Sequence, residues 1–166
     1  GGCLFVETVG GDMQHELRRK DRGMSESEAR ELLQQGEYGV LSLCSADNEP
    51  YGLPLSYCVL DNAIYFHCAL EGRKLALLAA NSRASFCVVG STEVLPEKFS
   101  TRYESVIVSG VVTKVLDDDK QRGLAGLVAK YSSSFMSEGL HYIGVQWQAT
   151  RVFKLSIDAV SGKARR

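Results

Sequence analysis

Residues 63–81 read AIYFHCALEGRKLALLAAN, a stretch whose pattern changes from that of a strand to that of a helix. The apolar run at 63–69 is typical of a buried strand. Asp61-Asn62, directly before it, predicts a tight hairpin turn. In 73–81 the leucines recur at the spacing of one helix face. A strand that enters by a hairpin and leaves into a helix is therefore the centre of the predicted fold.

Strand-like segments recur on both sides of this stretch. Further strands are predicted at 40–45, 50–60, 83–91, 105–116 and 150–158. Pro54 interrupts one of them, so we expect it at a sheet edge or a bulge, because proline cannot donate to a strand ladder. Gly110 is expected to mark a bend or a bulge in another.

Two more helices are predicted. One begins after Ser25, which stands three residues before Glu28 at the capping-box spacing, and it ends at Gly36. The other covers 119–130, with three consecutive aspartates capping its start. Residues 131–139 are predicted to be a loop or a short helix. No helix or strand is predicted for the basic tail that follows the last strand.

Six strands joined mostly by hairpins, with about three helices, indicate a mainly β fold. The strands and helices do not alternate as in a parallel sheet, so we predict an antiparallel barrel or sandwich with helices at its ends. The length of 166 residues fits one domain. We expect an N-terminal arm over 1–23 and a single domain over 24–166.

Composition excludes several classes of function. The formal net charge of −1 gives no overall attraction to nucleic acid or to acidic membranes. No apolar run approaches the ~18 residues of a membrane helix, and the early CLFV is too short for a signal-peptide core. The expectation is a cytoplasmic protein without nucleic-acid or membrane partners.

The five cysteines form no CxxC pair and are odd in number. This usage is typical of small buried hydrophobic residues in a reducing compartment. Cys68 beside His67 is the candidate for a catalytic thiol, but adjacent strand residues point to opposite faces. A cysteine nucleophile is therefore disfavoured.

The start of the helix at 73–81 is a candidate anion site. A helix N-terminus has free backbone N–H groups and a partial positive charge, which together suit phosphate. Gly72 would let the backbone pass close to a ligand, and Arg73 and Lys74 add two full charges where cations are otherwise disfavoured. The alternative is a glycine turn followed by two solvated cations.

Two further segments could contact a ligand. In STRYESVIVSG (100–110), Glu104 and Ser105 lie where an apolar strand begins, and a planar ligand with polar edges could lie there. The alternative is a polar loop rim. In PLSYCVL (54–60) backbone groups near Pro54 could face the same ligand, although this signal is weak alone.

His67 has three readings, namely a hydrogen-bonded core residue, a metal ligand or an acid/base. The only other histidines are His15 and His141, and neither HxH nor HExxH occurs, so a metal site is disfavoured. GxSxG, GxGxxG and GxxxxGK[ST] are also absent. Tyr142 and Trp147 are aromatic candidates for a binding surface, with core packing or a subunit interface as the alternative.

Taken together, these motifs resemble a known family. The segments GVLSL, PYGLPLSY, YFHCALEGRKLALLAAN, SFCVV, TRYESVIVSG and a terminal SGKARR are similar to the flavin-nucleotide-binding branch of the pyridoxamine 5′-phosphate oxidase superfamily. Within it, the nitroimidazole-resistance protein-like subfamily is the most similar. The resemblance covers residues 18–166, and HxAxxGxK and RYxSV are specific only in combination.

The resemblance implies a fold and a cofactor. The implied fold is a six-stranded antiparallel split β-barrel of the Greek-key type, with flanking helices. Members of the family bind FMN and form homodimers with both FMN sites in the dimer interface. The resemblance therefore implies FMN as cofactor and a second copy of this chain as partner.

It also implies a set of cofactor-binding residues. Arg73 and Lys74, after Gly72, correspond to residues that hold the FMN phosphate, and His67 to a histidine near the flavin. The isoalloxazine ring is expected beside Leu53, Pro54, Leu55, Ser56 and Tyr57, and, from a neighbouring strand, beside Glu104, Ser105 and Val106. Lys163 and Arg165 match a recurrent basic ending that contacts the phosphate or the other subunit.

One departure bears on the substrate. The pyridoxamine 5′-phosphate oxidases proper carry a basic strand where PYGLPLSY stands here, which argues against pyridoxamine phosphate as substrate. The leading hypothesis is an FMN-dependent, nitroreductase-like oxidoreductase in which the flavin carries the electrons. His67 is the candidate catalytic residue. The alternatives are a flavin-binding protein without a dedicated substrate and a haem-binding split barrel with His67 or His141 as axial ligand.

Overall fold

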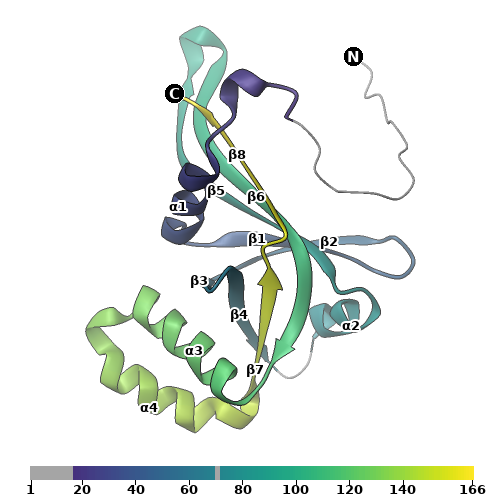
Figure 1. The fold of residues 1–166 in the computed structure, drawn as a ribbon, viewed down its shortest axis with the longest axis vertical. Coiled ribbons are helices and arrows are strands. Elements are labelled where there is room, and N and C mark those ends of the chain that lie inside the picture. Colours follow the sequence, from purple (N-terminus) through teal and green to yellow (C-terminus); the bar gives the residue numbers. More distant parts are fainter. Residues whose placement is uncertain (1–16, 70–71) are drawn as a thin grey trace.

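A curved, open antiparallel sheet forms the body of the protein in a computed structural model, which describes residues 17–69 and 72–166 (Figure 1). Its strands are β1 (Gly39–Cys44), β2 (Pro50–Leu55), β3 (Cys58–Leu60), β4 (Ala63–Ala69), β5 (Arg83–Leu95), β6 (Ser100–Val115), β7 (Thr150–Ser156) and β8 (Ala159–Arg165). They follow the order β2-β1-β5-β6-β7-β4-β3, and β8 pairs with β6. The predicted mainly β, split-barrel class is confirmed, but the predicted number of six strands is wrong, since the described residues form eight.

One extra strand arises because the segment predicted as a single strand at 50–60 is divided. β2 pairs with β1, whereas β3 pairs with β4 in another part of the sheet. Between them the hydroxyl of Tyr131 accepts a hydrogen bond from the Tyr57 amide at 3.0 Å and donates to the Glu37 carbonyl at 2.6 Å. The Tyr131 side chain thus takes the place of strand-to-strand hydrogen bonds at the break between β2 and β3. β2 ends the strand order, so Pro54 lies on an edge strand as predicted.

The other extra strand is β8, which the sequence presents only as a basic tail. It pairs with β6 from Tyr103↔Arg165 to Ser109↔Ala159. β6 then exchanges β8 for β7, which it pairs from Val112 onward. Gly110 lies at this exchange, where a Cβ atom would stand 1.7 Å from the Ser156 carbonyl oxygen. The register shift in the β5–β6 pair falls elsewhere, between Val89 and Thr92.

Helices cover parts of the sheet. They are α1 (Glu26–Gln35), α2 (Arg73–Ala80), α3 (Asp117–Tyr131) and α4 (Met136–Gln146), with short 3-10 turns η1 (Lys20–Arg22), η2 (Pro96–Lys98), η3 (Ser133–Phe135) and η4 (Trp147–Ala149). The predicted capping box of α1 and its end at Gly36 are present. The aspartates at the start of α3 make no side-chain cap, contrary to expectation. α4 extends well beyond the loop or short helix predicted at 131–139.

The hairpin between β3 and β4 has the predicted two-residue turn. Asp61 and Asn62 have φ of 45° and 60°, and Leu60 pairs directly with Ala63. Positive φ at both central residues is the requirement of the turn type that matches strand twist. This turn fixes the register of β3 against β4, and in the separate pairing of β4 with β7 His67 lies opposite Val152.

Two buried clusters hold the fold together. The larger lies inside the curved sheet and includes Phe86, Phe153 and Tyr57, with α1 and α2 packed on it. The smaller lies between the β3-β4-β7 part of the sheet and the α3–α4 pair. Trp147 packs against this second cluster, whereas Tyr142 is exposed.

Within residues 17–69 and 72–166 the helices α1 and α2 pack on the core side of the β2-β1-β5-β6-β8 part, and no helix covers its opposite side. We call this side the outer face. The register places Pro54, Val40, Cys87, Ile107 and Ser161 in one row across it. All five are at least partly exposed.

The predicted arm lies mostly outside the described residues, which begin at 17. Its described end reaches the sheet, since Gly23 forms a bridge with Lys163 and the Met24 amide donates to the Gly162 carbonyl at 3.0 Å. The domain boundary at 23/24 stays a prediction. Among the helices of the described part, none combines the length and apolar character that a bilayer crossing requires.

Candidate functional site

The start of α2 combines a special backbone with two cations. Gly72 is the N-cap with φ of 144°, a conformation that favours glycine. A Cβ atom there would meet no described atom within 4 Å, so the glycine serves the backbone angle and leaves open space beside it. No acidic residue stands in the first turn of α2, and no side chain caps it. Residues 70 and 71, which lead into the turn, lie outside the described residues.

Arg73 is loosely held in this structure. Its guanidinium lies 3.6 Å from a Glu49 carboxylate oxygen and 4.7 Å from the centre of the Tyr51 ring. Both members of the ion pair are exposed, and such pairs contribute only ~0–1 kcal/mol. The guanidinium can therefore exchange this partner for a stronger anion at little cost.

Lys74 lies close enough to the end of β4 to act on His67. Desolvation by surrounding protein atoms, and then the charge of Lys74, lower the pKa of His67. The imidazole is therefore neutral at pH 7. The neighbouring Cys68 is buried, and this burial raises the pKa of its thiol despite Lys74 and Arg151 nearby. A raised pKa suppresses the thiolate, which agrees with the disfavoured cysteine nucleophile.

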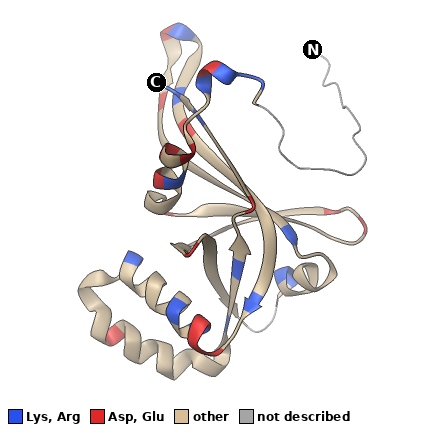
Figure 2. Cartoon of the chain, in the orientation of Figure 1, with Lys and Arg blue, Asp and Glu red and all other residues tan. Residues whose placement is uncertain are grey.

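The donor set at the start of α2 fits a phosphate group. Two cationic side chains, unused N–H groups of the first turn and open space at Gly72 meet at one place. Figure 2 shows this cationic start of α2 beside the mostly uncharged β2. The edge of β2 also leaves unpaired backbone groups along 53–55, which suit a ligand with polar edges.

Five of the other predicted site residues point toward the inside of the sheet. Leu55, Tyr57 and Val106 are buried, while Leu53 and Glu104 are half-buried. Glu104 accepts a hydrogen bond from the Ser91 amide at 3.2 Å, beside the register shift of β5. The Tyr57 hydroxyl donates to the Leu33 carbonyl. Within one chain most of these side chains pack inside the sheet, and Glu104 also borders a surface hollow.

The remaining predicted residues lie on the outer face. Pro54 and Ser56 are exposed there at the β2 end, and Ser105 pairs directly with Lys163. Arg165 follows on the same side of β8 and lines a surface hollow with Arg102 and Arg166. Figure 1 places this end of β8 far from α2. One chain therefore does not bring Lys163 and Arg165 together with Arg73 and Lys74.

Arg151 is a half-buried cation that no sequence motif indicates. It pairs with Cys68 across β4 and β7, and its Nε atom is buried without a hydrogen-bond partner in the described structure. A cation at the start of an apolar strand is the signal that could have pointed to it. Among the described residues no group of His, Cys, Asp and Glu is arranged to hold a metal ion.

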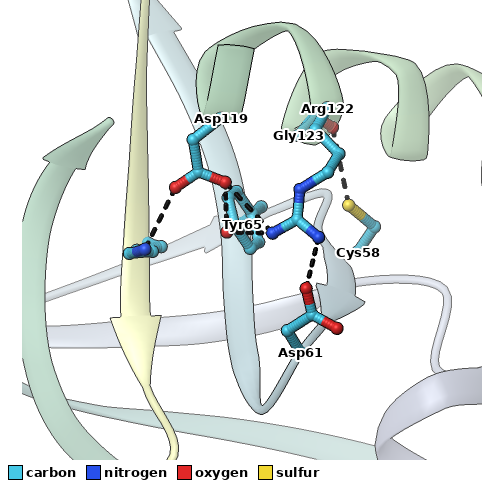
Figure 3. A network of polar contacts seen from close by, with 7 residues as sticks. Cys58, Asp61, Tyr65, Asp119, Arg122 and Gly123 are labelled. Carbon is cyan, nitrogen blue, oxygen red and sulfur yellow. Dashed lines mark hydrogen bonds and ion pairs between the residues drawn. The ribbon is translucent and has the colours of Figure 1, made fainter. Parts of the chain in front are cut away.

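A network of polar contacts joins α3 to the sheet and to the β3–β4 turn (Figure 3). Asp119 on α3 accepts from the Tyr65 hydroxyl at 2.8 Å, from Lys154 at 3.0 Å and from Arg122 at 3.1 Å. Arg122 also pairs with Asp61 in the β3–β4 turn. Every charge in the network has a partner, so it attaches α3 to the sheet.

The family follows from a comparison with family models. A model described as pyridoxamine 5′-phosphate oxidase matches residues 25–164, most of the chain. The chain belongs to this family. The match spans the sheet, the start of α2 and the α3–α4 pair of this pyridoxamine 5′-phosphate oxidase family member. No curated protein matches it significantly.

Several solved structures share the fold of this family member. A putative 5-nitroimidazole antibiotic resistance protein from Bacteroides thetaiotaomicron has a TM-score of 0.70 at 18% identity, with 85% of each chain covered. A conserved hypothetical protein from Mycobacterium tuberculosis has a TM-score of 0.77 at 18% identity, with 91% of each chain covered. The FAD and heme binding protein from Mycobacterium smegmatis has a TM-score of 0.71 at 21% identity, covering 86% of this chain and 72% of that one.

Proposed function

We propose that the protein is an FMN-binding flavoprotein whose phosphate site is the start of α2. The observation that carries this proposal is the meeting of Gly72, Arg73 and Lys74 at a helix N-terminus without acidic residues. A phosphate dianion offsets the unfavourable placement of two cations there. Family membership and the FAD and heme binding protein that shares the fold support a flavin.

The isoalloxazine ring is proposed to lie along β2. This edge strand offers free backbone groups beside the half-buried Leu53 and the exposed Ser56. Such groups can hydrogen-bond the polar edge of a flavin while the ring packs on apolar side chains. His67 stands at the end of β4, near the start of α2, and is neutral, so it is the candidate to exchange a proton with a substrate.

The working unit is proposed to be a homodimer that buries the outer face. This face exposes Val40, Val89, Ile107 and Val111, and Tyr38 precedes β1 on the same side. Exposed apolar side chains gathered on one sheet face are typical of an interaction surface. Ser105, Lys163 and Arg165 share this face, so a second chain against it would meet them. A site built from two chains accounts for the separation of the two cationic groups.

With a flavin in place, the activity we propose is oxidoreduction of a small molecule, as in nitroreductases. The bound flavin would supply the electron transfer, and the protein would bind, orient and shield it. A flavin-binding protein without a dedicated substrate is the alternative on the same site. Oxidation of NADH or NADPH by the FMN-loaded protein, with and without a nitroaromatic acceptor, separates the two.

Haem binding is a second candidate. His67 is exposed and makes no hydrogen bond to a described residue, so a ring nitrogen is free to bind iron, and a heme binding protein shares the fold. The visible spectrum of the purified protein, or of protein incubated with each cofactor, distinguishes a flavin from a haem. Replacement of His67 by Ala removes an axial ligand and leaves the phosphate contacts in place.

The phosphate assignment is tested by removing its charges. The double variant Arg73→Ala/Lys74→Ala is expected to weaken FMN binding at least ~100-fold, because charge-assisted hydrogen bonds contribute roughly 1.5–3 kcal/mol each. Riboflavin, which lacks the phosphate, should bind both proteins equally. Affinity is measured by quenching of flavin fluorescence.

Arg83→Ala provides the matched control, since Arg83 is an exposed cation just past the other end of α2. Its affinity for FMN should equal that of the original protein. Equal FMN affinity in the double variant would refute the phosphate site. Absence of binding by FMN and riboflavin alike in the original protein would refute flavin binding altogether.

A further inference from the structure

A cavity of about 190 Å³ lies between β4 and the α3–α4 pair. Its apolar wall consists of Leu124, Leu127, Val128 and Ile143. Three of these side chains are buried, and Val128 packs beside them. The wall therefore belongs to the second core and is fixed in shape by it.

Four polar side chains complete the lining, namely His67, Tyr142, Gln146 and Thr150. None of the four makes a side-chain hydrogen bond to another described residue. His67 and Tyr142 are exposed and Gln146 and Thr150 are half-buried, so all four are available to pair with a ligand in the hollow. An apolar hollow with a few convergent polar groups is the usual form of a small-molecule site.

The lining also sets the size and charge of what fits. An apolar cavity of ~150 Å³ is enough to bind benzene, so about 190 Å³ suits one ring with a small substituent. None of the lining residues is an acid, a lysine or an arginine. Desolvation and the Lys74 charge lower the pKa of His67, so it is neutral at pH 7. The lining itself offers an ionised ligand no counter-charge in place of its lost hydration.

We propose that this cavity binds an uncharged single-ring compound, with His67 and Gln146 hydrogen-bonding its polar substituent. Aromatic amides and related neutral rings have this chemistry. The site lies beside the proposed flavin position because His67 borders both, but ring binding itself does not depend on the flavin. It would place a small aromatic substrate next to His67, the candidate for proton exchange.

The test compares benzamide with benzoate, which have nearly the same shape but differ in charge. Each is titrated into methyl-labelled full-length protein without added FMN, and carbon–proton NMR spectra are recorded. Benzamide is expected to shift the methyl signals of Leu124, Leu127, Val128 and Ile143, and benzoate should bind at least tenfold more weakly. The experiment is read without flavin, so it remains decisive if the proposed FMN site fails.

Two substitutions test whether the ligand binds in this cavity. Gln146→Leu keeps the size of the side chain and should weaken benzamide at least fivefold. Leu127→Phe fills the cavity and should abolish binding. If Leu127→Phe does not fold, His67→Phe serves instead, because His67 is exposed and its loss leaves the core intact. Leu140→Phe on the exposed side of α4 is the control and should bind normally.

Three results would overturn the proposal. The first is benzamide shifting no methyl of the cavity up to its solubility limit. The second is equal affinity for benzoate, which would contradict an uncharged site. The third is unchanged benzamide binding in both Gln146→Leu and the cavity-filling variant, which would place the ligand elsewhere.

Discussion

At the scale of single residues, long-range hydrogen bonds decide what local patterns leave open. Tyr131 at the end of α3 holds the break between β2 and β3, and its hydroxyl contacts the backbone of Tyr57 and Glu37. Asp119 at the start of the same helix accepts hydrogen bonds from Tyr65, Lys154 and Arg122. Both ends of α3 are therefore attached to the sheet by single polar side chains.

The Asp119 network predicts a dependence of stability on pH. The hydrogen bond from Tyr65, followed by those from Lys154 and Arg122, lowers the pKa of Asp119 to about 2. In the unfolded chain an aspartate titrates near ~3.9. Because the folded pKa is the lower one, the stabilisation is complete above the unfolded pKa and is lost as the pH falls from about 4 toward 2.

Asp119→Asn should therefore lower the free energy of unfolding by about 1 kcal/mol at pH 7, a modest value because solvent screens the site. The difference from the original protein should shrink as the pH falls below 4. Urea unfolding followed by circular dichroism measures both. Asp118→Asn is the control, since Asp118 has no polar contact with a described residue. A constant difference at all pH values would contradict the assignment.

At the scale of elements, α1 shows a helix that is defined locally and positioned by the tail. Ser25 and Glu28 exchange two hydrogen bonds of 3.1 Å at its start. Its buried Ala29 lies against Gly162 of β8, where a Cβ atom would come within 2.8 Å of the alanine Cβ. The helix therefore requires β8, an element that the sequence did not reveal.

Ser25→Ala is expected to destabilise the protein by about 1 kcal/mol, because two backbone donors at the start of α1 lose their reciprocal cap. This corresponds to a fall in Tm of roughly 2–4 °C for a chain of this size. Ser27→Ala is the matched control in the same turn and should be neutral or slightly stabilising, since alanine favours the helix. Thermal unfolding of the original protein and the two variants measures these Tm differences. Equal Tm values for both variants would show that the cap contributes nothing to stability.

At the scale of the whole molecule, the two sides of the sheet are unequally covered. α3 and α4 cover the β3-β4-β7 part, whereas no helix of the described residues covers the outer face of the larger part (Figure 1). Ile107 and Val89 in its middle are 48% and 58% exposed. This asymmetry is the structural basis of the proposed homodimer.

Ile107→Asp should convert the dimer to a monomer. The side chain is exposed in the single chain, so the substitution should not unfold it, but in the proposed dimer the aspartate would be buried against the second chain. We expect at least a tenfold weaker association in sedimentation velocity at micromolar concentration, with an unchanged circular dichroism spectrum. Leu116→Asp, at an equally exposed apolar residue after β6, should remain dimeric. A monomeric original protein would refute the dimer and with it the two-chain site.

The sequence by itself determined the local features. Positive-φ residues at 61 and 62, the capping box of α1, the edge position of Pro54 and the cationic start of α2 all follow from short-range chemistry. Family membership also follows from the sequence, since it rests on motifs along the chain.

Only the tertiary structure decided which side of each strand faces inward and where each strand finds its partner. Alternation along β6 separates Glu104 and Val106 from Ser105, but burial against α1 and the larger core selects the side on which each lies. The basic tail becomes β8 because β6 offers it an unpaired edge. The segment 50–60 becomes two strands because Tyr131, far along the chain, satisfies the backbone at the break. Such pairings depend on contacts between distant residues, and a local pattern contains no information about them.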